Sequence, residues 1–266
     1  MTWILGTAVP FGYGARIADV RVSWPNGKRL DVLQKVHTIS PWIIAGFAGS
    51  VEFGFQSIGD LQHCFPEPTT ERRFSYFSRM VAWKWYRRLR RAYATAPLPI
   101  RRYPFSLMLA AAEPTPMQPF PLSRCIRMSS LSNPPFEPQF VPAFQWWSIG
   151  SGSTHIDAAH FANMDMKAFA EFWGKGEIQN PGGGASMIAS SVIAGLKRNP
   201  KSDVGGQIQI GCAFSNRFDI RTLDVNQVSE RWRSEQRVES TGLARTWEEF
   251  KAVADANDLT ANAAAT

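Results

Sequence analysis

Long apolar runs and paired cysteines are both missing from this 266-residue sequence. No stretch approaches the roughly 18 consecutive apolar residues of a membrane-spanning helix, and the N-terminus lacks the basic region and cleavage site of a secretory signal. The cysteines Cys64, Cys125 and Cys212 are odd in number, far apart and outside any CxxC spacing. We therefore expect buried thiols in a cytoplasmic protein that has neither a membrane span nor a disulfide framework.

Sequence signs of a metal or a cofactor are also scarce. His155 and His160 are five residues apart, a spacing that does not place two ligands on one face of a helix. The glycine run NPGGGAS at 180–186 is not followed by the lysine of a phosphate-binding loop, and it predicts a turn. We expect no metal and no cofactor.

What the sequence does have is a large apolar fraction and an excess of positive charge. Hydrophobic residues make up 44% and aromatic residues 12% of the chain, enough for a full core. The formal net charge is +7, and six arginines lie in one segment, KWYRRLRRAYATAPLPIRR at 84–102. Phe77, Val81, Trp85 and Leu89 recur every four residues, which predicts an amphipathic helix over about 71–93.

The arginine face of this predicted helix has two interpretations. The favoured one is a solvated face available for ion pairs with a neighbouring subunit, because an amphipathic helix has a polar side. Nucleic-acid binding by arginines interleaved with Trp85, Tyr86 and Tyr93 is the less favoured alternative. The rest of the chain shows no matching basic motif.

Alternating and helical periodicities predict an ordered series of strands and helices. The chain opens with a hairpin of strands at 3–9 and 15–24, joined by the turn PFGYG, and two more strands flank Ser40–Pro41. Further strands are expected at 105–112, 125–130, 144–150, 205–214 and 218–224, and helices at about 50–62, 71–93, from 153, at 184–199 and at 246–257. The Pro-rich run NPPFEPQFVP is expected to be ordered but irregular, and the tail LTANAAAT has no pattern to hold it.

The order of these elements is strands, two helices, strands, two helices, strands. Such segregated runs favour an α+β fold in which antiparallel sheets are covered by helices on their outer faces. No fixed repeat and no break in composition divides the chain. We therefore expect a single domain over 1–266.

Several landmarks occur in one order along the chain: Thr2, then Asp19 and Arg21 in IADVRVSW, then Lys35 sixteen residues after that aspartate. The run IIAGFAGS leads into one predicted helix, and SIGSGS opens another. This combination resembles the proteasome-type β-subunits. It is most similar to the bacterial members, the two-ring heat-shock peptidase and the proteasome homologue of β-proteobacteria.

The resemblance covers part of the chain, residues 2–62 and 144–213. Residues at about 93–143 are expected to form an insert, and those from about 215 a C-terminal extension. The resemblance implies a four-layer αββα sandwich of two antiparallel sheets, the fold of the N-terminal nucleophile hydrolases.

The chemistry of that family uses a terminal threonine hydroxyl as nucleophile and the free amine of the same residue as base. A free α-amine has a pKa of about 7.7–8.0, close to working pH. Thr2 becomes terminal only when Met1 has been removed, because an amide nitrogen is no base. A small residue after Met suits methionine aminopeptidase, so we expect no propeptide.

The resemblance also assigns the other site residues. Lys35 matches the active-site lysine, whose charge lowers nearby pKa values, and Asp19 matches the carboxylate that holds it. Gly46 matches the residue whose N–H stabilises the oxyanion. Ser151 and Asp203 match the residues that orient the amine, although the serine that usually follows three residues after the aspartate is a glycine here.

The substrate is expected to lie extended between the Val22–Ser23 strand and the Gly46 segment, adding its backbone as a strand. The side chain before the cleaved bond enters an apolar pocket, with His37 a candidate for its rim. We expect cleavage after apolar residues, because the matching pocket positions are Val22, Leu33, Ile44 and Ala48.

The first functional hypothesis is a cytoplasmic threonine endopeptidase that acts on unfolded polypeptide. The resemblance implies a homo-oligomeric stacked double ring, with an ATPase unfoldase as a further partner. The alternative is a ring-forming scaffold or binding protein in which catalysis is weak or absent. A small-molecule amidase of the same superfamily is less favoured, because such enzymes usually expose a different first residue.

Overall fold

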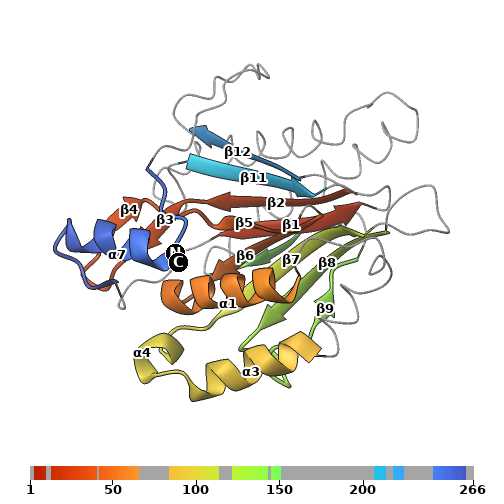
Figure 1. The fold of residues 1–266 in the computed structure, drawn as a ribbon, viewed down its shortest axis with the longest axis horizontal. Coiled ribbons are helices and arrows are strands. Elements are labelled where there is room, and N and C mark those ends of the chain that lie inside the picture. The colour runs from red at the N-terminus through yellow and green to blue at the C-terminus, as the bar shows by residue number, and fades with distance from the viewer. Residues whose placement is uncertain are drawn as a thin grey trace.

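The three-dimensional structure is a computed structural model. It describes residues 3–9, 13–40, 42–65, 84–113, 122–142, 145–150, 207–213, 218–224 and 242–261. The described chain is an α+β protein with two five-stranded antiparallel sheets and a separate two-stranded ribbon (Figure 1).

The first sheet is built around the N-terminal hairpin. Ile4 pairs with Ala18 and Val9 with Tyr13, so the two strands of the hairpin are joined by a three-residue connection. Every neighbouring pair in this sheet is antiparallel. The strand order is β10 (Trp147–Ile149), β1 (Ile4–Val9), β2 (Tyr13–Asp19), β11 (Gln207–Ala213) and β12 (Phe218–Asp224).

The second sheet is a meander in sequence order. It consists of β5 (Val36–Ser40), β6 (Ile43–Ala48), β7 (Ser106–Glu113), β8 (Leu122–Ser129) and β9 (Gln139–Phe140). All residues of β6 and residues 107–112 of β7 are buried, which fits internal strands covered on both faces. The ladder between β5 and β6 carries an irregularity between Thr38 and Ser40.

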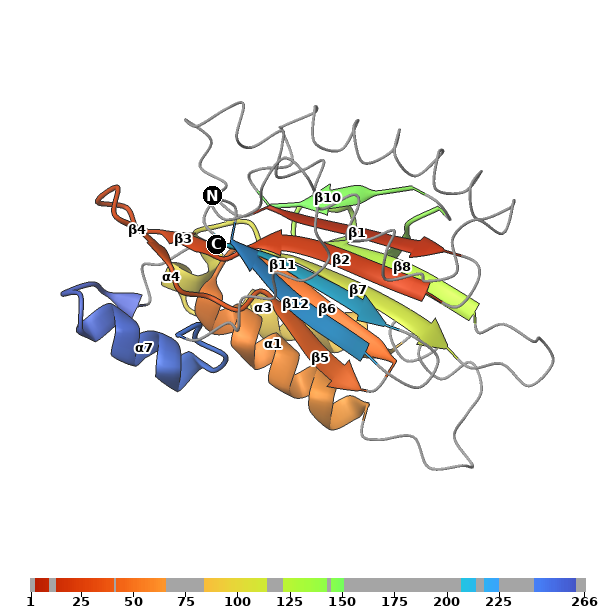
Figure 2. The same ribbon diagram turned by 90° about the horizontal axis from the view of Figure 1, so that it is seen from above.

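The two sheets are stacked face to face (Figure 2). Strands β1 and β2 contact β7 and β8, and β11 contacts β5 and β6. Small residues keep the sheets close: a Cβ on Gly6 would lie 2.2 Å from the Met108 sulfur. The buried residues of the layer between the sheets include Ile4, Ala8, Ala18, Val36, Ala48, Met108, Cys125, Val141 and Ile149.

Helices cover the outer face of the second sheet. They are α1 (Val51–Cys64), α3 (Tyr86–Thr95), the short α4 (Leu98–Arg101) and α7 (Trp247–Asp255). Hydroxyl caps begin α1 and α7, where Ser50 accepts from the Phe53 N–H and Thr246 from the Glu249 N–H. No helix in the described part of the chain combines the length and the apolar character that a membrane crossing requires.

The apolar faces of these helices and of the second sheet form the largest core. Phe53 of α1 meets Phe105 edge to face with ring centroids 4.8 Å apart, and Phe47 of β6 meets Phe55 at 5.7 Å. Trp85 and Leu89 are buried as the four-residue spacing predicts, while the arginines of α3 are exposed. The predicted arginine-faced helix is therefore confirmed over its described part.

Most predicted elements lie where the periodicity places them. Strand β12 has the predicted bounds, and α1 runs two residues beyond its predicted end. The expected strand over 15–24 is instead broken at Val20, because the Val20 carbonyl accepts the Leu33 N–H and the chain turns into a ribbon of β3 (Arg21–Ser23) and β4 (Arg29–Asp31). The predicted helices from 153 and at 184–199 lie outside the described residues.

Segments expected to be peripheral are part of the fold. Residues 93–143 supply β7 and β8 to the second sheet, and the region after 215 supplies β12 and α7. The prediction that nothing holds the tail is wrong as far as Ala261. Leu259 and Ala261 are buried, and the Thr260 carbonyl accepts from the Trp24 indole N–H at 3.2 Å.

Candidate functional site

A fully buried ion pair lies where the two sheets meet. Asp19 ends β2, Lys35 immediately precedes β5, and Lys35 Nζ is 2.8 Å from Asp19 Oδ1. The side chains of both residues have 0% exposure. The chain reverses between them through the β3–β4 ribbon, which brings residues sixteen apart in sequence into contact.

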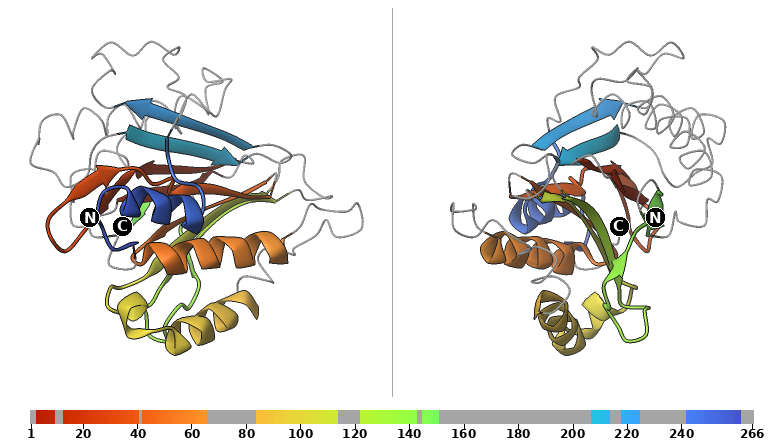
Figure 3. Two further views of the ribbon diagram at one scale, coloured as in Figure 1. Left: turned by 60° about the vertical axis from the view of Figure 1, so that its left-hand side comes forward. Right: turned by 90° about the vertical axis from the view of Figure 1, so that its right-hand side faces the viewer.

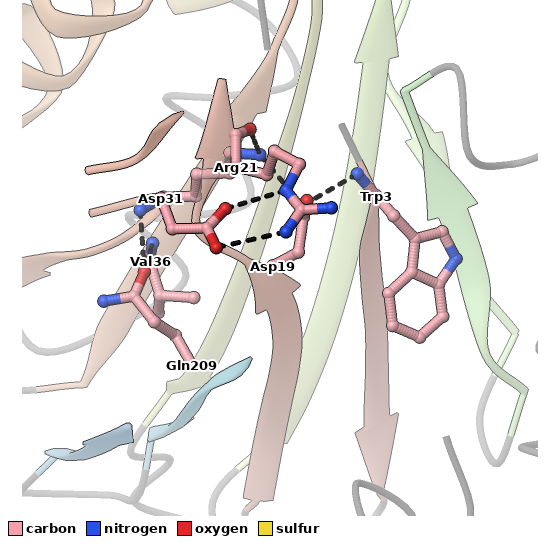
Figure 4. A network of polar contacts seen from close by, with 7 residues as sticks. Trp3, Asp19, Arg21, Asp31, Val36 and Gln209 are labelled. Atoms are coloured by element: carbon pink, nitrogen blue, oxygen red, sulfur yellow. Dashed lines mark hydrogen bonds and ion pairs between the residues drawn. The ribbon is translucent and has the colours of Figure 1, made fainter. Parts of the chain in front are cut away.

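Backbone groups complete the surroundings of the pair (Figure 4). The Trp3 N–H donates to the same oxygen, Asp19 Oδ1, at 3.1 Å, and the Trp3 carbonyl accepts the Asp19 N–H at 3.3 Å. Lys35 Nζ also donates to the Arg21 carbonyl at 2.5 Å. The ammonium is thus held between a carboxylate and a carbonyl, at the start of β1.

Thr2 itself lies outside the described residues, but its peptide bond ends at the Trp3 nitrogen. That nitrogen and Lys35 Nζ share one carboxylate oxygen. The other oxygen, Asp19 Oδ2, is buried and has no hydrogen-bond partner among the described residues. The buried Asp19–Lys35 pair therefore binds the residue that follows the predicted nucleophile in the sequence.

Burial dominates the ionisation of this pair. It raises the pKa of Asp19 above its usual range, and the Lys35 ammonium and the Trp3 N–H oppose that rise. Burial likewise lowers the pKa of Lys35, against the opposing effect of Asp19. A buried lysine with a lowered pKa is closer to exchanging a proton at neutral pH than a surface lysine is.

Gln209 is a residue of this site that the sequence prediction missed. It lies in β11, is fully buried, and its Oε1 accepts the Lys35 N–H at 2.7 Å and the Val36 N–H at 3.2 Å. The first sheet thereby holds the start of β5 through one side chain. A polar residue between Ile208 and Ile210 of a buried strand is the signal that could have indicated it.

A second ion pair lies on the β3–β4 ribbon, close to solvent. Arg21 donates to both carboxylate oxygens of Asp31, at 2.8 and 3.1 Å, across the β3–β4 register. These side chains are 22% and 34% exposed, so the pair faces solvent. Its fixed fork geometry holds the strand whose Arg21 carbonyl binds Lys35.

Gly46 belongs to an internal strand of the second sheet, and its role as oxyanion donor stays a prediction. It lies inside β6, opposite Val36 of β5 on one side and Met108 of β7 on the other. In an internal antiparallel strand the N–H points within the sheet to a neighbouring strand. Glycine at this position allows β6 to lie close to the backbone of Lys35, since a Cβ would be 3.0 Å from the Lys35 carbonyl oxygen.

The four residues predicted to line the substrate pocket are all buried, but they do not lie in one cluster. Val22 and Leu33 belong to the core under the helices. Ala48 belongs to the layer between the sheets, and Ile44 packs on Ala110. Ser23 is half-buried in β3 opposite Arg29. A shared apolar pocket stays a prediction.

His37 lies in the interior, not at a rim. It is 4% exposed, stacks on Phe47 with centroids 5.6 Å apart, and meets Phe55 edge to face at the same distance. Burial lowers the pKa of His37 to about 4, and a hydrogen bond to the Gln34 backbone opposes this. A neutral imidazole is therefore part of the core near α1.

The remaining predicted site residues, Ser151 and Asp203, lie outside the described residues, so their approach to the site stays a prediction. The described residues bring together no group of three or more His, Cys, Asp or Glu side chains that could hold a metal ion.

Comparison of the chain with the known protein families and with curated proteins finds no match.

Proposed function

We propose that this chain is an N-terminal threonine hydrolase, an endopeptidase that cleaves extended polypeptide after apolar residues. The observation that carries the proposal is the buried Asp19–Lys35 pair, which shares its carboxylate with the nitrogen that links Thr2 to Trp3. A buried ion pair is not explained by fold stability alone, because apolar residues of similar volume often give equal or greater stability at such a site. The pair contacts the Trp3 nitrogen, which follows Thr2 directly in the chain, and this supports a chemical role.

The reaction follows from these groups. Once Met1 is removed, the Thr2 amine takes the proton of the Thr2 hydroxyl, and the oxygen attacks the peptide carbonyl carbon. The amine then gives that proton to the departing nitrogen as the C–N bond breaks, leaving an ester on Thr2. Water activated by the same amine hydrolyses the ester. The nearby Lys35 ammonium, fixed by Asp19, favours the deprotonated hydroxyl.

Further parts of the proposal rest on the resemblance. Ser151 and Asp203 orient the amine, and Val22, Ser23, Leu33, Ile44 and Ala48 receive the substrate. The fold is the four-layer αββα sandwich, assembled as a homo-oligomeric double ring in the cytoplasm, with an ATPase unfoldase supplying unfolded chains. The two antiparallel sheets and the helices on one outer face are compatible with that architecture.

A second candidate function is a ring-forming scaffold with weak or no catalysis. The observation that favours it is the burial of the predicted pocket residues in separate parts of the protein's own core. The placement of Gly46 inside the β6 ladder points the same way.

Intact-mass analysis with a β-lactone separates the two functions. The peptidase predicts a protein that has lost Met1 and that gains one lactone on Thr2. Thr2→Ala and Lys35→Ala should lose the adduct while the circular dichroism spectrum of Thr2→Ala is unchanged, and the exposed Lys28→Ala should keep it. A protein without Met1 whose Thr2 takes no adduct would establish the scaffold instead.

A further inference from the structure

One edge of the helix layer is strongly basic. Residues 84–103 contain Lys84 and six arginines and no acidic residue. Only Arg88 has an ion-pair partner in the described part of the chain, Asp60 of α1 at 2.5 Å. The others are exposed, and neither Arg90 nor Arg91 forms an ion pair with an acidic side chain in the described part of the chain. We call these seven residues the basic edge: Lys84, Arg87, Arg88, Arg90, Arg91, Arg101 and Arg102.

Helix α7 has the opposite character. Residues 247–261 contain four acidic residues and one lysine, and all five are exposed. None of the acidic side chains forms an ion pair with the described residues. The Glu249 carboxylate accepts a hydrogen bond from the Arg245 backbone N–H. We call the four acidic residues the acidic edge: Glu248, Glu249, Asp255 and Asp258.

The two edges lie on opposite sides of α1. Helix α3 is fixed to α1 by the Trp85 indole N–H, which donates to Asp60, and by the contact of Phe53 with Tyr93. Helix α7 also contacts α1. Both views of Figure 3 show α7 and α3 on either side of α1, in the layer that covers the second sheet. Charges of opposite sign therefore border one layer, separated by a helix.

Two different surfaces that complement each other on one molecule produce head-to-tail association, which closes into a ring when the rotation permits. Opposite charges across such an interface guide encounter and fix the register. We propose that the basic edge of one copy docks on the acidic edge of the next copy. Leu98, 75% exposed beside Arg101, supplies an apolar contact that this docking would cover.

The proposal identifies the surfaces that join neighbouring subunits, and it does not depend on the Thr2 chemistry. A polyanion such as nucleic acid is the competing occupant of the basic edge, but it would leave the acidic edge without a role. A second copy accounts for both edges with one contact.

Charge reversal tests the docking. One variant carries Arg90→Glu and Arg91→Glu, a second carries Glu248→Lys and Asp255→Lys, and a third combines all four changes. Sedimentation velocity at about 50 mM salt, where surface charges are least screened, should show the wild type assembled and the first two variants as single chains. The combined variant, and an equimolar mixture of the first two, should assemble again. Glu137→Lys, an exposed reversal on another surface, should assemble normally.

A wild-type protein that sediments as a single chain would overturn the proposal, and so would a combined variant that fails to assemble although its circular dichroism spectrum is unchanged. Oligonucleotide binding that is lost with Arg90→Glu and Arg91→Glu in a single-chain protein would assign the basic edge to nucleic acid. Thr2→Ala should assemble like the wild type, so loss of the peptidase proposal leaves this result unaffected.

Discussion

At the scale of single residues, removing the partner of Asp19 or of Lys35 should cost more stability than removing the partner of an exposed charge, because both side chains are fully buried. Both are withdrawn from water, and each offsets the desolvation of the other. The Arg21–Asp31 pair lies only one strand away but keeps contact with solvent. The two pairs therefore provide a matched comparison of a buried and an exposed ion pair.

Asp19→Asn should lower the free energy of unfolding by about 3–5 kcal/mol, because the Lys35 ammonium stays buried without its counter-charge. Asp19→Asn combined with Lys35→Met should recover much of that loss. Urea unfolding followed by tryptophan fluorescence measures both. Asp31→Asn, the control, should cost at most about 1 kcal/mol, and equal losses at the two aspartates would contradict the burial argument.

His37 should make stability depend on pH. Its pKa is lowered to about 4 in the folded state, against 6.5 for the free side chain. As pH falls from about 6.5 to about 4, the unfolded chain takes up a proton that the folded chain does not, so the unfolded state is favoured. The effect of His37 is absent above about pH 6.5, and by pH 4 this residue lowers the free energy of unfolding by roughly 3 kcal/mol.

The measurement is the difference in unfolding free energy between wild type and His37→Phe from about pH 4.5 to about pH 7. This range covers most of the interval in which the folded and unfolded chains differ in protonation. We expect the wild type to lose stability more steeply than His37→Phe as the pH falls. His63→Phe, at an exposed position of α1, is the control and should follow the wild type. Parallel curves for wild type and His37→Phe would show that His37 is not the responsible group.

At the scale of elements, the contact of α1 with β6 depends on one glycine. A Cβ on Gly54 would lie 2.2 Å from the Phe47 ring, which is itself buried against His37 and Phe105. Gly59, one and a half turns later, has nothing within 4 Å of its would-be Cβ. The same substitution at these two positions therefore separates packing from helix propensity.

Gly54→Ala should destabilise the protein by about 1–3 kcal/mol, because Phe47 cannot move without displacing its neighbours. Gly59→Ala should raise the free energy of unfolding by up to about 1 kcal/mol, since alanine is the better helix former. Thermal and urea unfolding of the two variants decide the matter. A stabilised Gly54→Ala would mean that α1 lies farther from β6 than described.

At the scale of the whole molecule, the C-terminal region completes the core begun near the N-terminus. Phe250 of α7 is fully buried and stacks on Trp24 with centroids 5.8 Å apart. The segment before α7 pairs with the chain beside Lys35: the Gln34 N–H donates to the Ala244 carbonyl, and the Ala244 N–H donates to the Val32 carbonyl. Residues more than two hundred positions apart thus support the neighbourhood of the candidate site.

Phe250→Ala should cost about 3–5 kcal/mol, the usual loss for truncating a buried aromatic ring. Lys251→Ala, on the exposed side of the same helix, should change stability by no more than about 0.5 kcal/mol. Urea unfolding of both variants is the measurement. A small loss at Phe250 would show that α7 is not part of the cooperative core.

Much of the secondary structure was already determined by the sequence. Helices α1 and α7 follow from periodicities and caps within about fifteen residues, since the hydrogen bonds of a helix are local, and β12 pairs with β11, the strand just before it in the chain. The break at Val20 and the ribbon after it could not be predicted, because they depend on Leu33 and Lys35 from the next segment. The candidate site itself was found by resemblance, as no local pattern links Asp19 to Lys35.

The tertiary structure alone decided which groups share the site. It brought Gln209 to Lys35 across 174 positions, placed Gly46 inside a ladder, and distributed the predicted pocket residues over three clusters. It also placed the arginine-rich helix α3 and helix α7, which carries acidic residues, on either side of α1. The physical reason is that periodicity specifies which residues share a face of their own element, whereas the partner of that face is chosen by burial among elements distant in the chain.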